Sequence, residues 1–177
     1  MSGKRVVMVV DMQNGVFATP RVGRERCAAL INQLTRAADQ VIFIQHCEEG
    51  GLEEGSDGFQ ILPELYQPDN ALYVTKTACD SFYKTSLETV LREQDINAFV
   101  ICGCATDYCV DTTIKNGASR GYAITVAGDA HTTANRAAAD AHTLIEHHNE
   151  VWRTLIVPGN PVRVKSVETI LHEWQAN

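Results

Sequence analysis

Five short apolar runs that alternate with segments of helical character constrain the fold of this chain more than any other feature. The runs are RVVMVV (5–10), QVIFIQ (40–45), ALYVT (71–75), AFVIC (98–102) and YAITVA (122–127). They are rich in β-branched residues and apolar on both faces, a pattern typical of strands in a parallel sheet that helices cover on both sides. WRTLIV (152–157) is a weaker candidate for a sixth strand.

Segments of helical periodicity separate these runs. Residues 24–38 carry apolar side chains at the spacing of one helix face. Thr106 is expected to cap a further helix, which runs to about Arg120 and stops at Gly121. The alternation predicts an α/β fold of three layers (α/β/α) around a doubly wound, mostly parallel, six-stranded, Rossmann-like sheet.

The charge balance and length narrow the range of partners. The chain has 177 residues, enough for one domain, and 15 Lys and Arg against 22 Asp and Glu give a net charge of −7. Without a basic cluster to offset it, that charge disfavours both nucleic acid and anionic membrane as partners. The run VVMVV is too short for a signal peptide, and no run approaches the ~20 apolar residues that cross a bilayer.

We therefore expect a cytoplasmic protein, in which most cysteines are free thiols. The cysteines are Cys27, Cys47, Cys79, Cys102, Cys104 and Cys109.

Three polar groups are expected at one rim of the sheet, where open parallel sheets bind ligands. Asp11 follows the first run, Lys76 follows the third, and the turn GCATDYCV (103–110) follows the fourth. In a helix capped by Thr106, Cys109 would lie in the first turn, where the helix dipole and Lys76 would both favour the thiolate. From position alone, Cys109 is either reactive or structural, and Asp11 with Lys76 is either catalytic or an ordinary salt bridge.

Neither a metal nor another cofactor is expected. Cys102 and Cys104 are spaced too tightly for a zinc knuckle, and no second pair follows. His46 with Glu48 and Glu49 offers another possible ligand set, which we interpret as solvated polar residues. A nucleotide- or flavin-binding module is disfavoured, because the first strand leads into DMQNG, with one glycine and an acid, rather than into a glycine-rich phosphate loop.

Three blocks of sequence resemble the isochorismatase-like cysteine hydrolases, which include nicotinamidases, N-carbamoylsarcosine amidohydrolases and isochorismatases. The blocks are VVMVVDMQNGVF (6–17), TKTACDSFYKTSLETVL (75–91) and GCATDYCVDTTIKNGASRGYAITVAGDA (103–130). The resemblance extends from about Val6 to Val126 and implies a single hydrolase domain over residues 1–177. It also implies a homo-oligomer, for which the helix-rich C-terminal segment is a candidate interface.

The resemblance implies a catalytic triad of Asp11, Lys76 and Cys109. It further implies a cis peptide between Cys104 and Ala105, which would turn the Ala105 N–H toward the site. The N–H groups of Ala105 and Cys109 would then form an oxyanion hole. The implied reaction is hydrolysis of a C–N bond of a small amide through a thioester.

Two departures from family patterns limit what carries over. Metal-dependent nicotinamidases have an Asp-x-His pair and further histidines after the second strand, whereas QHCEEGGLEEG (45–55) contains His46 alone. Isochorismatases cleave a vinyl ether and some lack the cysteine, so Cys109 favours C–N cleavage. Ether hydrolysis remains an alternative, as does a redox or peroxide sensor in which Cys104 resolves oxidised Cys109.

Substrate-binding candidates are the polar and aromatic residues that flank the triad in sequence. They are Gln13, Phe17, His46, Tyr83 and Tyr108. The segment 48–57 contains five acids, from which we hypothesise a preference for basic or neutral amides; an ordinary solvated acidic loop is the alternative.

Overall fold

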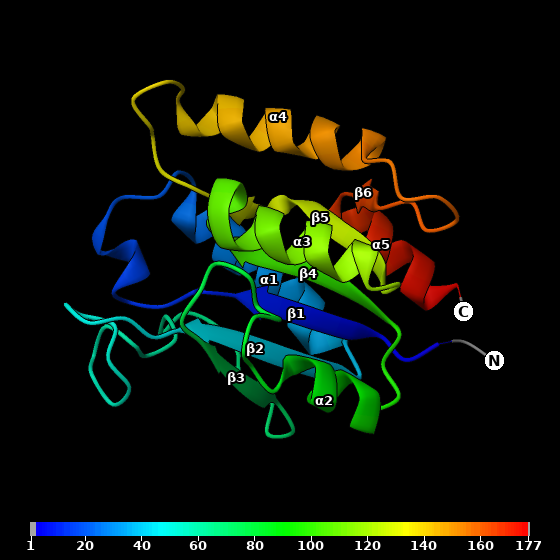
Figure 1. Ribbon diagram of the computed structural model, residues 1–177, viewed down its shortest axis with the longest axis horizontal. Helices are drawn as coiled ribbons and strands as arrows, with labels where there is room; N and C mark the ends of the chain where they lie inside the picture. The colour runs from blue at the N-terminus through cyan, green and yellow to red at the C-terminus, as the bar shows by residue number, and fades with distance from the viewer. Residues whose placement is uncertain (1–2, 177) are drawn as a thin grey trace.

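A six-stranded sheet forms the middle layer of the molecule (Figure 1). The computed structural model describes residues 3–176. Its strands are β1 (Val6–Val10), β2 (Gln40–His46), β3 (Leu72–Lys76), β4 (Ala98–Cys104), β5 (Ala123–Thr132) and β6 (Arg163–Lys165). They lie in the order β3-β2-β1-β4-β5-β6, and every neighbouring pair is parallel. The predicted doubly wound α/β fold is confirmed.

Helices cover both faces of this sheet (Figure 1). They are α1 (Arg24–Ala37), α2 (Leu87–Glu93), α3 (Asp111–Ser119), α4 (Ala141–Thr154) and α5 (Val167–Gln175), with the short 3-10 helix η1 (Val16–Ala18) and the π-helix η2 (Thr106–Val110). β1 is buried throughout, and its side chains alternate between two cores. Val7 and Val9 pack on the side of α1 and α5, and Met8 and Val10 pack on the side of α2, α3 and α4.

The first five predicted strands are present, and the sixth was misplaced. Residues 152–157 were expected to form it, but they contain the end of α4 and the loop that follows. Trp152 is fully buried because it belongs to the apolar face of α4, and its indole N–H donates to Asp111. The actual sixth strand, β6, has only three residues and lies at the edge of the sheet, which leaves little apolar pattern to detect. None of the helices in residues 3–176 is both long and apolar enough to cross a membrane.

The chain reverses its winding direction between β1 and β4, and these two strands approach closely at their carboxyl ends. Gly103 in β4 has φ +116°, a conformation that favours glycine. A Cβ atom at this position would lie 2.3 Å from the Val10 carbonyl oxygen. A side chain would therefore push apart the two strands that form the topological switch point.

The long segment after β2 packs against the residues that follow β1. Gln13 and Ile61 form an antiparallel bridge, and backbone bonds join Asn14 to Gln60 and Leu62 to Met12. This segment therefore forms one wall beside the carboxyl end of β1.

We predict that Gly103→Ala costs at least about 3 kcal/mol of unfolding free energy, because the added methyl meets buried backbone that cannot move aside. Gly121→Ala is the matched control, since Gly121 also has positive φ (+95°) but has open space around its Cβ position. It should cost only about 1–2 kcal/mol, the price of the left-handed conformation. Urea unfolding of both variants measures the difference, and equal costs would contradict the close-approach argument.

Candidate active site

Four neighbouring strands each bring one side chain to the same point at the carboxyl rim of the sheet. Lys76 ends β3, His46 ends β2, Asp11 directly follows β1, and Cys109 lies in η2 just after β4. The point lies at the switch between β1 and β4, where open α/β sheets bind their ligands. The expected convergence of a carboxylate, an ammonium and a thiol is therefore present in the structure.

The Lys76 ammonium lies at the centre of this group. Its Nζ is 2.9 Å from Asp11 Oδ2, 2.9 Å from His46 Nδ1 and 3.3 Å from Cys109 Sγ, and it also donates to the Ala78 carbonyl at 3.0 Å. Lys76 is 1% exposed. Burial alone would lower the pKa of Lys76, but the charge of Asp11 and the hydrogen bonds to Asp11 and Cys109 raise it, with a net increase. The ammonium therefore stays charged.

Asp11 presents a carboxylate with one engaged oxygen and one unengaged oxygen. Oδ2 pairs with Lys76, whereas Oδ1 is buried and accepts no hydrogen bond from any residue in 3–176. The backbone turns sharply here, because Asp11 has φ +48° while its N–H donates to Ile44 at 2.9 Å. Asp is among the few residues that adopt this conformation readily. A buried acceptor without a donor is unusual and marks a place for a proton.

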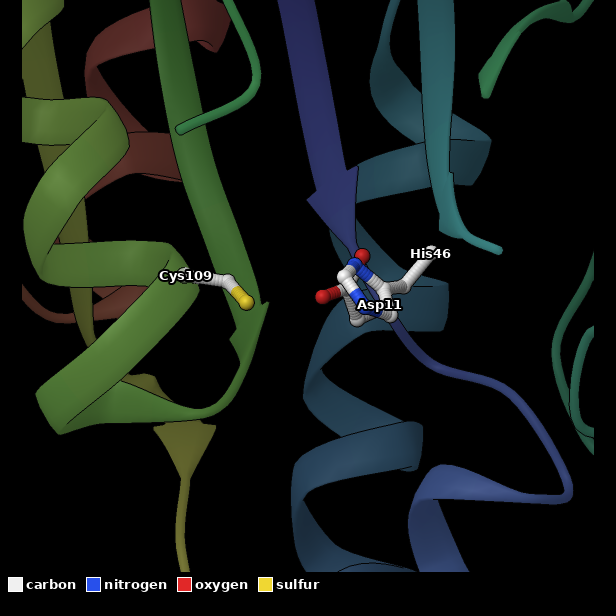
Figure 2. Close-up of side chains that lie close together, drawn as sticks. All are labelled: Asp11, His46 and Cys109. Carbon is white, nitrogen blue, oxygen red and sulfur yellow. The ribbon is translucent and has the colours of Figure 1, made fainter. Parts of the chain in front are cut away.

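Cys109 faces this carboxylate. Figure 2 shows a carboxylate oxygen of Asp11 directed toward the Cys109 sulfur, with His46 beside them. Burial raises the pKa of the Cys109 thiol, Asp11 raises it further, and Lys76 opposes both, with a net increase. Lys76 therefore favours the thiolate, as expected, but burial and Asp11 outweigh it. The resting sulfur is a thiol that needs a base.

The turn that carries Cys109 also differs from the expected helix start. Thr106 is not the cap; Ala105 precedes η2, and the N–H groups of Tyr108 and Val110 both donate to the Ala105 carbonyl. The peptide bond between Cys104 and Ala105 is cis.

The Thr106 hydroxyl is instead committed to a buried chain of hydrogen bonds. It lies 2.7 Å from His131 Nδ1, and His131 Nε2 lies 2.9 Å from Asn149 Oδ1. The Asn149 amide nitrogen donates to the Gly128 carbonyl, so its oxygen must accept the proton on His131 Nε2. His131 Nδ1 then accepts from Thr106. This chain fixes the start of η2 to β5 and α4.

The His46 ring acts as a neutral acceptor toward Lys76. An ammonium only donates, so His46 Nδ1 accepts and Nε2 carries the proton, 3.4 Å from Glu48 Oε2. Gln13 holds the end of β2 in place, since its side chain bonds both the N–H and the carbonyl of His46.

One group of residues in 3–176 has the composition of a metal site. Ligand atoms of Asp11, His46 and Cys109 all lie within 4.8 Å of one another. The Lys76 ammonium already contacts all three residues, so it supplies the positive charge around which they gather. A metal ion would have to displace it.

A cavity of about 300 Å³ opens above Cys109. Its lining is formed by Asp11, Gly15, Val16, Thr19, Arg21, His46, Glu48, Leu52, Cys79, Ala105, Tyr108, Cys109 and Arg136. Of the five substrate-binding candidates, His46 and Tyr108 line this cavity. Gln13 is buried beneath it, Phe17 belongs to the core beside α1, and Tyr83 is half-exposed elsewhere.

Sequence reasoning missed the two arginines of the cavity. Arg21 lies beyond η1, and Arg136 lies in the loop after β5. Arg136 is held by Asp107 in the GCATDYCV turn and lies over the Tyr108 ring at 4.7 Å. No local motif indicates either arginine. The one sequence signal was Asp107, whose carboxylate in the turn suggests a basic partner such as Arg136.

The fold and the site together define an α/β protein built around a cysteine, a carboxylate and an ammonium at a sheet switch point. A family model described as the isochorismatase domain matches residues 5–150. The chain belongs to the isochorismatase family, and this membership supports a hydrolase.

Individual relatives agree with this placement. The uncharacterized isochorismatase family protein YecD of Escherichia coli O157:H7 is 33% identical over 94% of each chain. A cysteine hydrolase from Pseudomonas syringae pv. phaseolicola has a similar structure, with a TM-score of 0.88, 19% identity, and coverage of 98% of this chain and 93% of that one. An N-carbamoylsarcosine amidase from Thermoplasma acidophilum gives a TM-score of 0.75, 21% identity, and coverage of 94% and 98%. At these identities the two structures show a shared fold.

We predict that Lys76→Met destabilises the protein by about 3–5 kcal/mol, because it leaves the buried Asp11 charge without a partner. Asp11→Asn combined with Lys76→Met should recover a large part of that loss, since it removes the orphaned charge as well. Urea unfolding of the two single variants and the double variant gives the coupling energy. Additive losses would show that the pair is not coupled.

His131 predicts a pH dependence of stability. Burial lowers its pKa to about 4, helped by His148 and opposed by the Asn149 hydrogen bond and by Asp129. Below the ordinary pKa of ~6.5 the unfolded chain gains a proton that the folded protein refuses, so stability falls as the pH drops. The loss reaches about 3 kcal/mol at pH 4.

Unfolding free energies measured between pH 4 and 6.5 check this, and the slope should be shallower in His131→Gln. The exposed His172 supplies the control, and His172→Gln should follow the wild-type slope. Parallel slopes in all three proteins would contradict the assignment.

Proposed function

We propose that this protein is a cysteine hydrolase that cleaves an amide-type C–N bond of a small molecule through a thioester on Cys109. One observation carries the proposal: the buried Asp11 carboxylate, one oxygen of which has no hydrogen-bond donor, lies within 4.8 Å of a thiol whose pKa is raised. A thiol in this state is a poor nucleophile until a base removes its proton. Asp11 is the base within reach.

In the first step Asp11 takes the thiol proton and the sulfur attacks the substrate carbonyl carbon. A C–S bond forms, and the carbonyl π electrons move to oxygen. The N–H groups of Ala105 and Cys109 are proposed to hold this oxyanion, since both residues line the cavity.

Lys76 would lower the free-energy cost of this proton transfer. Its ammonium contacts both the Asp11 carboxylate and the Cys109 sulfur. When the proton moves, negative charge leaves Asp11 and develops on the sulfur, and both places lie beside the same cation. The buried site therefore keeps its net charge, and no large desolvation penalty arises during the step.

Collapse of the tetrahedral intermediate breaks the C–N bond. The proton on Asp11 passes to the leaving nitrogen, and ammonia or an amine departs. Asp11, again a carboxylate, then takes a proton from water, whose oxygen attacks the thioester. Breaking the C–S bond releases a carboxylic acid and restores the thiol, so one amide and one water give one acid and one amine.

The competing functions fit these contacts less well. The ether bond of an ether substrate has no carbonyl carbon with which Cys109 could form a thioester. A redox sensor that uses Cys104 would need the two sulfurs to meet, but Cys104 packs on the α1 side of the sheet and Cys109 on the α3 side. Cys104 is fully buried, and burial raises its thiol pKa well above the ordinary value.

All six cysteines are free thiols, which supports our further proposal of a cytoplasmic location.

We predict that the wild-type protein releases ammonia from at least one member of a panel of small primary amides, and that Cys109→Ala lowers this rate at least about 1000-fold. Cys47→Ala is the matched control: it also removes a partly exposed thiol, but one that does not line the cavity. Intact-protein mass spectrometry should detect the acyl adduct on wild-type protein and on Cys47→Ala. Full activity in Cys109→Ala would sink the proposal.

A further inference from the structure

The cavity beside Cys109 contains two guanidinium groups that differ in what they contact. Arg136 is neutralised in place: its Nε lies 2.8 Å from Asp107 Oδ2 and its Nη2 lies 3.2 Å from Asp107 Oδ1. It also donates to the Thr133 hydroxyl at 3.1 Å. Paired in this bidentate way, Arg136 serves mainly to shape the cavity wall.

Arg21 has no such partner. Its Nε donates to the Val16 carbonyl at 3.1 Å, which fixes the plane of the guanidinium. Within residues 3–176 no carboxylate lies within ion-pair distance of it. The side chain is only partly exposed and lines the cavity, so its charge is neither paired nor fully solvated.

The carboxylates of the cavity lining do not pair with Arg21. Asp11 pairs with Lys76, and Glu48 lies 3.4 Å from the His46 ring while 68% of its side chain is exposed. The Glu48 charge is therefore largely exposed to solvent, and Arg21 is the cation of this concave site that has no carboxylate partner within residues 3–176.

The position of Arg21 is fixed relative to the reacting centre. The next residue, Val22, receives a hydrogen bond from the Thr132 hydroxyl and donates its N–H to the Thr133 carbonyl at 3.1 Å. Burial raises the pKa of the Cys104 thiol, and Arg21 is the largest influence that lowers it. Two hydrogen bonds thus hold the residue next to Arg21 against Thr132 and Thr133 at the end of β5.

We propose that Arg21 binds a carboxylate of the substrate, which makes the substrate a small amide that also bears a carboxylate group. This inference rests on the proposed function, since it names the substrate class of the same site. Guanidinium matches carboxylate geometry with two parallel hydrogen bonds. A cavity of about 300 Å³ is at the small end of ligand sites and suits a compact molecule of this kind.

The acidic segment 48–57 does not oppose this assignment. Glu53 accepts hydrogen bonds from the N–H groups of Gly50 and Gly51, and Glu54 accepts one from Thr75. Of the five acids, only Glu48 lines the cavity. Four of the five acids therefore lie outside the cavity lining, so the hypothesis that they favour basic or neutral amides loses its basis.

Direct binding tests the proposal without turnover. In a Cys109→Ala background, calorimetry compares malonamate, succinamate and glutaramate with propionamide, butyramide and valeramide, in which a methyl group replaces each carboxylate. At least one carboxylate should bind ten or more times more tightly than its neutral counterpart. Arg21→Gln should reduce that ratio at least tenfold, and Arg21→Lys should retain part of it because it keeps the charge but loses the planar fork.

Arg26→Gln is the matched control, because it removes a positive charge from the neighbouring helix, outside the cavity. It should leave the ratio unchanged. The proposal is overturned if no carboxylate binds better than its neutral partner, or if the preference survives in Arg21→Gln. Since binding is measured without Cys109, this outcome is separate from the ammonia-release test of the hydrolase itself.

Discussion

Burial of the Lys76 ammonium is the constraint on which the site depends. A cation at 1% exposure is tolerable only if other groups replace its lost water, and Asp11, His46 and the Ala78 carbonyl do so together with the Cys109 sulfur. The same contacts fix the geometry of the reactive groups relative to one another. Stability and chemistry are thus tied to a single electrostatic balance: the carboxylate that compensates the cation is also the proposed base.

The sheet determines that these groups can meet at all. Parallel strands end at the same rim, and the order β3-β2-β1-β4 places the four contributing ends side by side. The absence of a side chain at Gly103 lets β4 approach β1 at the switch point. The distance between the Asp11 side and the Cys109 side of the cavity is therefore set by backbone packing, which is far stiffer than side-chain packing.

The sequence predicted the architecture and the convergence of Asp11, Lys76 and Cys109, because β-branched runs and strand-end positions are local signals that topology turns into proximity. It did not predict the protonation state of Cys109, which depends on burial and on competing charges in three dimensions. It misplaced the sixth strand because the apolar residues of WRTLIV suit a short strand as well as the end of a helix. It also missed Arg21, because the lack of a carboxylate partner for this side chain is visible only in three dimensions.

The reactive groups and the proposed recognition group come from different kinds of backbone. Asp11, Lys76 and His46 lie on or directly after strands of the central sheet, and Cys109 lies in η2 shortly after β4, whereas Arg21 and Glu48 lie in longer connecting segments. Substitutions and insertions in connecting segments are tolerated far better than changes in a buried sheet. Such a division allows substrate specificity to change during evolution while the catalytic residues stay the same. Relatives that share this site therefore need not act on the same substrate.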